Sequence, residues 1–267
     1  MTGTALPVAL DETPLGRARS GLDLCVHCGF CLQACPTYLV LEDENDSPRG
    51  RLLLMRGAVE GELAIDDPAL TTHIDRCLGC RACETACPSG VPYGHLLEAT
   101  RATIATREPI GRVSRMVLAV MGSPSLRRIA FGLARLARGL RLTSILSRLP
   151  GRAGFAFAML ESTRPVFSSE PAVVNGTGAR GTVATLDGCV MEGLFGHTNA
   201  ATRAVLSRND YSPVSAQGQG CCGALHAHAG DAAGARALAR KNVEAFERAG
   251  AEWIAVNAAG CGAMMKD

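Results

Sequence analysis

Two runs of cysteines have types and spacings that could bind iron–sulfur clusters. The chain contains Cys25-Val-His-Cys28-Gly-Phe-Cys31-Leu-Gln-Ala-Cys35-Pro36 and Cys77-Leu-Gly-Cys80-Arg-Ala-Cys83-Glu-Thr-Ala-Cys87-Pro88. Both have the form C-x2-C-x2-C-x3-C-P, in which three thiolates bind one cubane and the fourth binds the other. We therefore predict two [4Fe-4S] clusters with crossed ligands. The expected sets are Cys25, Cys28, Cys31 and Cys87 for one cluster, and Cys77, Cys80, Cys83 and Cys35 for the other.

Two other uses of these cysteines fit the pattern less well. A structural zinc site takes four ligands, usually as two C-x2-C pairs, and leaves the third and fourth cysteine of each run without a role. Disulfides need an oxidising compartment, and the chain does not open with the charged, apolar and small-residue segments of a secretory signal. Clusters that transfer single electrons are the favoured interpretation.

Composition excludes some classes of function. The 267 residues have a net charge of +2 and only 4% aromatic residues, which argues against a nucleic-acid-binding surface. No apolar run approaches the roughly 18 to 20 residues that span a bilayer. We expect a cytoplasmic protein, with any membrane contact peripheral and on the inner face of the plasma membrane.

The elements that position the first cysteines are expected to be helical. Residues 1–16 lack a hydrophobic period and predict a flexible leader, followed by a helical two-cluster domain over residues 17–108. The 41 residues between Cys35 and Cys77 include Leu52, Met55 and Val59 at helical spacing. The arginines of Ser47-Pro-Arg49-Gly-Arg51 could be solvated at a helix start, or could lie beside an anionic cluster.

Residues 109–180 are predicted to form a basic connector and linker. Nine arginines and no acidic residue occur between Pro109 and Arg152, and a Ser, Pro and Gly-rich stretch follows up to residue 180. Helical spacing places five apolar residues on one face and arginines 127, 128, 135 and 138 on the other. This helix could pack on the cluster domain, bind an anionic membrane or bind a partner subunit. The apolar residues are Leu126, Ile129, Leu133, Leu136 and Leu140.

Residues 181–267 predict a second domain of α/β type. Strand patterns near residues 181–189 (ended by a turn), 213–217 and 253–257 alternate with helical patterns near 196–208 and 231–249. The fold class is therefore α+β and multidomain. Four further cysteines follow the predicted strands, where loops of a parallel sheet place ligands. Cys189, Cys221, Cys222 and Cys261 could form an additional redox or cluster site, or could be small buried residues.

The histidines give a weaker signal. His226 and His228 are two residues apart, a spacing that places both on one face of a strand but not of a helix. In a helix they cannot form a simple metal pair, although one of them could face the cysteine loop. The other four have no partner visible in the sequence and are expected to be ordinary surface or turn residues. They are His27, His73, His95 and His197.

With these motifs assembled, the chain resembles iron–sulfur subunits of bacterial glycolate oxidase and the wider CCG-domain family related to heterodisulfide reductase. The resemblance rests on both cysteine runs, Asp46-Ser-Pro-Arg-Gly-Arg51, Cys221-Cys-Gly-Ala-Leu-His-Ala-His228 and Asn257-Ala-Ala-Gly-Cys-Gly262. It implies electron transfer from flavin-containing glycolate oxidase subunits through two [4Fe-4S] clusters towards a quinone-type acceptor. It also implies that this chain has no catalytic residues of its own and that flavin is bound only by the partner.

Two departures from this family leave alternatives open. The CCG pattern of heterodisulfide reductase closes with C-x2-C, whereas Met264 stands three residues after Cys261. The family also has a second CCG half, and this chain ends just after the first, so we expect a truncated protein. The alternatives are a heterodisulfide reductase-like thiol/disulfide redox subunit, an iron–sulfur subunit of an (S)-lactate or glycerol-3-phosphate dehydrogenase, or a bare electron carrier.

Overall fold

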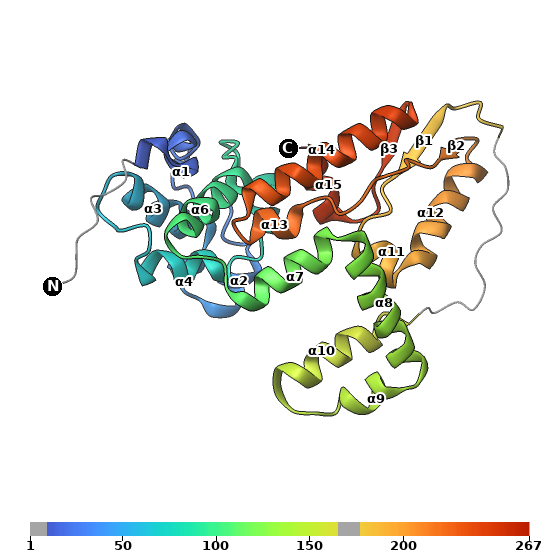
Figure 1. Ribbon diagram of the computed structural model, residues 1–267. Coiled ribbons are helices and arrows are strands. Elements are labelled where there is room, and N and C mark those ends of the chain that lie inside the picture. The colour runs from blue at the N-terminus through green and yellow to red at the C-terminus, as the bar shows by residue number, and fades with distance from the viewer. Residues whose placement is uncertain (1–9, 165–176, 267) are drawn as a thin grey trace. The chain divides into compact units, whose positions relative to one another are not determined.

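The computed structural model describes residues 10–164 and 177–266, which divide into two compact units (Figure 1). The first unit contains residues up to 114 together with residues 225–232. The second contains residues 115–224 and residues from 233 onward. The two cysteine runs therefore lie in the first unit, and the other four cysteines lie in the second.

Short helices and turns make up the first unit. Proline occupies the first turn of four of the helices, where its missing N–H has no helical partner to lose. The side chains of Thr13, Ser47 and Asp67 cap helix N-termini by accepting backbone N–H groups. The elements are η1 (Leu10–Glu12), α1 (Pro14–Arg17), η2 (Arg19–Gly21), α2 (Pro36–Leu41), η3 (Glu44–Asp46), α3 (Pro48–Val59), α4 (Pro68–Arg76), α5 (Ala82–Thr85), α6 (Tyr93–Arg107) and α13 (Ala224–His228).

The hydrophobic core of the first unit supports the cysteines directly. Met55 from α3, Ile74 from α4 and Leu96 from α6 are fully buried in it. Cys83 is a member of this core, and Cys25, Cys31, Cys77 and Cys87 pack against it. The predicted helical period of Leu52, Met55 and Val59 is confirmed, because all three contact this core from α3.

Residues 10–16, which the sequence pattern assigns to a flexible leader, form helical structure. The prediction of a flexible leader up to residue 16 is wrong for residues 10–16, which form η1 and most of α1. Leu15 is fully buried in the core, and its N–H donates to the hydroxyl of Thr103 in α6. A single buried leucine has no periodicity of its own, so this anchor was not recognisable as a pattern. Residues 1–9 lie outside the described residues.

Four helices follow the first cysteine domain. They are α7 (Arg112–Gly122), α8 (Pro124–Gly139), α9 (Leu142–Leu146) and α10 (Gly151–Glu161). The predicted connector helix is confirmed as α8. The expected linker from residue 151 is wrong for residues 151–161, because the Ala, Met and Leu residues between Gly154 and Glu161 favour a helix. Residues 165–176 lie outside the described residues.

The apolar face predicted for α8 is exposed to solvent. Its five apolar residues, counting Leu140 just beyond the helix, have between 47% and 63% of their surface exposed, and only Phe131 of this helix is buried. Other large apolar residues of α7, α9 and α10 are also exposed, among them Val113, Ile145 and Phe155. Among the residues that the structure describes, these side chains of α7 to α10 therefore keep roughly half or more of their surface open to solvent.

A small parallel sheet forms the centre of the second unit. Its strands β1 (Thr182–Thr185), β2 (Ser212–Val214) and β3 (Trp253–Ala255) lie in the order β2-β1-β3, and the adjoining helices are α11 (Val190–Leu194), α12 (Gly196–Arg208), α14 (Ala232–Ala249) and α15 (Ala259–Lys266). The predicted fold class is confirmed: a helical cluster domain, helical connector and α/β domain. Among the described helices, none has the length and apolar character needed to cross a membrane.

Candidate iron–sulfur sites

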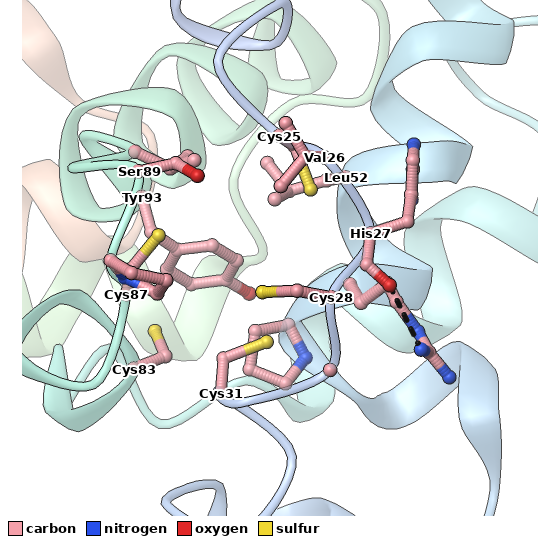
Figure 2. Close-up of a pocket in the computed structure, with 15 residues that line it drawn as sticks. Cys25, Val26, His27, Cys28, Cys31, Leu52, Cys83, Cys87, Ser89 and Tyr93 are labelled. Carbon is pink, nitrogen blue, oxygen red and sulfur yellow. Dashed lines mark hydrogen bonds between the residues drawn. The ribbon is translucent and has the colours of Figure 1, made fainter.

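A pocket between the two cysteine runs contains the first predicted ligand set. Cys25, Cys28 and Cys31 line it from the first run, and Cys87 lines it from the end of the second. Figure 2 shows the side chains of these four residues around one space, with the ring of Tyr93 beside it. Cys83 also borders this pocket. Four thiols converging on a pocket with a largely apolar wall are the donor set that a [4Fe-4S] cluster uses.

A second pocket contains the other predicted set. Cys77, Cys80 and Cys83 line it from the second run, and Cys35 lines it from the end of the first. Cys35 does not line the first pocket, and Cys87 does not line the second. The fourth cysteine of each run thus lies at the pocket of the other run, which is the arrangement that crossed ligation requires.

The two loops have the same backbone conformation at equivalent positions. His27 and Gly29 have positive φ angles of 56° and 84° in the first run, and Gly79 and Arg81 have 66° and 58° in the second. Left-handed residues that alternate with others turn successive N–H groups towards one point, a geometry that binds anions and iron–sulfur clusters. The duplicated sequence therefore folds into two similar cradles.

The spacing of the sulfur atoms does not suit a single metal ion. Within residues 10–164 and 177–266, three potential ligands have their donor atoms within 4.8 Å of one another at Asp43, Asp46 and His73, and at no group of three cysteines. In a tetrahedral zinc site, bonds of about 2.3 Å bring sulfurs closer than this. The cysteines fit a wider cluster of several irons.

A buried ion-pair network lies beside the second pocket. The Asp46 carboxylate accepts from Arg51 at 3.1 Å and from Arg76 at 2.9 Å, and Nδ1 of His73 lies 3.0 Å from it. The side chains of Asp46 and Arg51 are 0% exposed. Burial raises the pKa of Asp46, but the hydrogen bonds and charges of its three partners outweigh it and lower the pKa. This network joins η3, α3 and α4. The guanidinium groups of Arg51 and Arg76 compensate the charge of the Asp46 carboxylate.

Both arginines of the Ser47-Pro-Arg49-Gly-Arg51 stretch lie at the candidate sites. Arg49 lines the first pocket, donates to the carbonyl of His27 at 3.3 Å and pairs with Glu44. Arg51 lines the second pocket, where its Nη1 donates to the Thr37 hydroxyl at 3.1 Å and lies 3.9 Å from the Cys35 sulfur. Of the two open interpretations, the position beside the cysteines is the one the structure supports.

Tyr93 lies between the two pockets and lines both of them. Its hydroxyl is 3.5 Å from the sulfur of Cys77, and the side chain is buried at the start of α6. Burial is the main cause that raises the pKa of Tyr93 well above its ordinary value, so the residue keeps its proton. Burial likewise raises the pKa of Cys83 to about 12, so this thiol needs a positive partner to ionise.

The second unit brings its four cysteines together at one edge of the sheet. Cys189 follows β1, Cys221 and Cys222 follow β2, and Cys261 follows β3 within α15. The sulfurs of Cys222 and Cys261 are 3.4 Å apart, and the thiols of Cys189 and Cys221 share a hydrogen bond. That bond and burial raise the pKa of Cys189, whereas a hydrogen bond with Cys222 lowers the pKa of Cys261. The three loops that carry these cysteines converge, as their positions after parallel strands predict.

The two histidines after this turn lie in α13, and both belong to the first unit. Because they are helical, they cannot form the metal pair that a strand would allow. The ring of His228 lies against Gly79 of the second cysteine run, where an added Cβ would be 3.1 Å from the ring. His73, expected to be an ordinary residue, instead pairs with Asp46.

The sequence reasoning missed Thr37, Asp46 and Tyr93 as residues of the sites. Tyr93 is 16 residues from Cys77, and Asp46 is 30 residues from Arg76, so neither contact has a spacing that a motif could reveal. Asp46 did belong to a stretch on which the family resemblance rests, which is the signal that could have singled it out.

Comparison with known proteins finds a match for the two cysteine runs and another for the domain that contains the other four cysteines. Residues 21–91 match the family model of the 4Fe-4S dicluster domain, and residues 183–266 match that of the cysteine-rich domain, CCG. The chain joins a dicluster iron–sulfur domain to a cysteine-rich domain. This iron–sulfur chain is similar to the glycolate oxidase iron-sulfur subunit of Escherichia coli, with 37% identity over 94% of its own length. It is 34% identical over 91% of its length to the probable glycolate oxidase iron-sulfur subunit of Bacillus subtilis.

The predicted resemblance is thereby confirmed, and the predicted [4Fe-4S] chemistry agrees with the dicluster model. The chain spans 59% of the length of the E. coli relative and 58% of the B. subtilis relative. No solved structure matches the chain significantly.

Proposed function

We propose that this chain is an electron-transfer subunit of a 2-hydroxyacid oxidase complex, with glycolate as the substrate of the partner. The observation that carries the proposal is the pair of pockets, each lined by three cysteines of one run and the fourth of the other. Clusters held there would accept and release one electron at a time. The relatives named as glycolate oxidase iron-sulfur subunits support the choice of complex.

The chain's own residues bind the clusters and shape their surroundings. The first site uses Cys25, Cys28, Cys31 and Cys87, and the second uses Cys77, Cys80, Cys83 and Cys35. Flavin is bound by the partner subunit, which takes two electrons from the 2-hydroxyacid, and a quinone-type molecule is the final acceptor. Cys28 and Cys80 are exposed, so each site has one ligand at the protein surface where a donor or acceptor could approach.

Electron transfer from flavin can be measured directly. When the chain is mixed anaerobically with the flavin subunits and glycolate is added, we expect its visible cluster absorption to bleach in stopped-flow measurements. A Cys28→Ala, Cys80→Ala double variant removes one ligand from each site and should abolish this bleaching. Reduction of the flavin while the clusters of the unmodified chain stay oxidised would contradict the proposed role.

The four cysteines of the second unit are proposed as a further redox or iron–sulfur site. Packing alone does not require four thiols from three loops, and the contact between Cys222 and Cys261 favours a shared role. Because the hydrogen bond with Cys221 and burial raise the pKa of Cys189, this thiol would bind as a thiolate only where a metal or cluster compensates its charge. The iron content of the purified chain measures whether these cysteines hold a cluster.

The connector is proposed to bind an anionic membrane surface from the cytoplasmic side. The exposed apolar face of α8 can enter the interfacial region, and the nine arginines between residues 109 and 152 match negatively charged lipid headgroups. No acidic residue in this segment opposes them. The combination of apolar exposure with one sign of charge favours lipid over a neutral protein partner.

Vesicle binding tests this proposal. We expect the chain to co-sediment with vesicles that contain phosphatidylglycerol and not with phosphatidylcholine vesicles. Replacing Arg128 and Arg135 by alanine should weaken binding about fivefold for each residue, since one arginine near such a surface contributes about 1 kcal/mol. Arg236→Ala with Arg240→Ala, in the exposed surface of α14, is the matched control and should change little. Equal binding to both vesicle types would count against lipid attachment.

A further inference from the structure

The two candidate sites differ in the side chains that surround their sulfur atoms. At the second site, the Tyr93 hydroxyl lies 3.5 Å from Cys77, and the Thr37 hydroxyl lies 3.2 Å from Cys35. Arg51 is the third group, with Nη1 3.9 Å from Cys35. A cysteine bound to iron has no proton to donate, so the contacts would then be made by donors on Tyr93, Thr37 and Arg51. The Thr37 hydroxyl has a single proton and also donates to the Asp46 carbonyl at 3.0 Å, so its proton would be shared between that oxygen and Cys35.

The first site has no equivalent side-chain donors. Among the described residues, no side-chain N–H or O–H is within hydrogen-bond distance of the sulfurs of Cys25, Cys28, Cys31 or Cys87. Arg49 lines the pocket, but its side chain donates to Glu44 and to the carbonyl of His27.

Hydrogen bonds to the sulfurs and nearby positive charge stabilise the more negative, reduced form of an iron–sulfur centre. Burial has the opposite effect, and Cys35 and Cys83 of the second site are more buried than the ligands of the first. Low polarity also strengthens each hydrogen bond made inside the site, and the Arg51 guanidinium is itself fully buried there. Burial disfavours the reduced form most at the second site, whose ligands are the more buried. The side-chain donors at that site therefore offset this effect.

We propose that the second site, formed by Cys77, Cys80, Cys83 and Cys35, has the higher reduction potential of the two, and that Tyr93, Thr37 and Arg51 set this order. The proposal rests on the electron-transfer role argued above. It assigns these three residues a positioning and tuning role, not a catalytic one. Under this assignment, an electron added to the chain occupies the second site in preference to the first.

A redox titration of the whole chain, monitored by electron paramagnetic resonance, tests this order. Tyr93→Phe keeps the buried ring and removes only the hydroxyl that contacts Cys77. We expect the one-electron reduction at the higher of the two potentials to become about tenfold less favourable, which lowers that potential by 59 mV. The lower potential should not change. Tyr211→Phe is the matched control, since Tyr211 lies in the second unit, and it should move neither step.

Two results would overturn the proposal. One is a shift of the lower reduction potential in Tyr93→Phe, because the site with the side-chain donors would then have the lower potential of the two. The other is no shift of either step in a variant that keeps about eight irons. If Tyr93→Phe loses iron, Thr37→Val provides the same comparison through Cys35 and is expected to lower the same step. A reversed order with clusters that still accept electrons from flavin would defeat this inference alone, whereas clusters that flavin cannot reduce would defeat the proposed function.

Discussion

Replacing Cys25 and Cys87 together by alanine should remove about four irons per chain, no more than replacing either one alone. The reason is that crossed ligation makes both residues ligands of the same [4Fe-4S] cluster, so the second change removes nothing further. Both residues line the first pocket, although they are 62 positions apart in the sequence. Iron and acid-labile sulfide analysis after anaerobic purification measures the effect.

The control removes the same number of cysteines from different pockets. Cys25→Ala with Cys35→Ala should remove about eight irons, because each change then affects a different cluster. The reverse pattern, with the larger loss in the Cys25 and Cys87 pair, would mean that each run binds its own cluster and that the crossed assignment is wrong.

Asp46→Asn is expected to destabilise the first unit by about 3 kcal/mol or more. The change leaves the Arg51 guanidinium buried without a compensating carboxylate, and breaking a buried ion pair in this way typically costs about 3–5 kcal/mol. Because η3, α3 and α4 meet at Asp46, the loss should also loosen the second cysteine site. Urea unfolding followed by circular dichroism and by cluster absorption measures both effects.

Asp23→Asn is the matched control for the buried aspartate. Asp23 pairs with Arg56 at 3.5 Å on the surface, where such pairs contribute about 0–1 kcal/mol. Because the pKa of Asp46 is lowered in the folded chain, its stabilisation is present above the unfolded value of about 4 and is lost as the pH falls through the folded value. Equal unfolding midpoints for the two variants would refute the structural role of the buried network.

The cysteine sites were predictable from the sequence because their chemistry depends on local spacing. The C-x2-C-x2-C-x3-C-P runs fix which residues share a loop. The known use of the fourth cysteine predicts the grouping in which Cys87 lines the pocket of the first run and Cys35 lines that of the second. Helical periods likewise placed Leu52 and Met55 in the core and identified α8, α12 and α14. Short-range patterns were sufficient for these features.

Contacts across long stretches of sequence could not be predicted in this way. The donors of the second site come from α2, α3 and α6, and only folding brings Thr37, Arg51 and Tyr93 to Cys35 and Cys77. The buried position of Leu15 has the same origin. For α8, the apolar period correctly identified one face, but a period does not say whether anything covers that face.

The number of irons and acid-labile sulfides per chain after anaerobic purification tests most directly whether the two pockets hold clusters. About eight of each are expected, since two cubanes contain that number. A value near twelve would add a cluster at Cys189, Cys221, Cys222 and Cys261. Four or fewer irons, or a stoichiometric amount of zinc in their place, would contradict the claim that these pockets hold two [4Fe-4S] clusters.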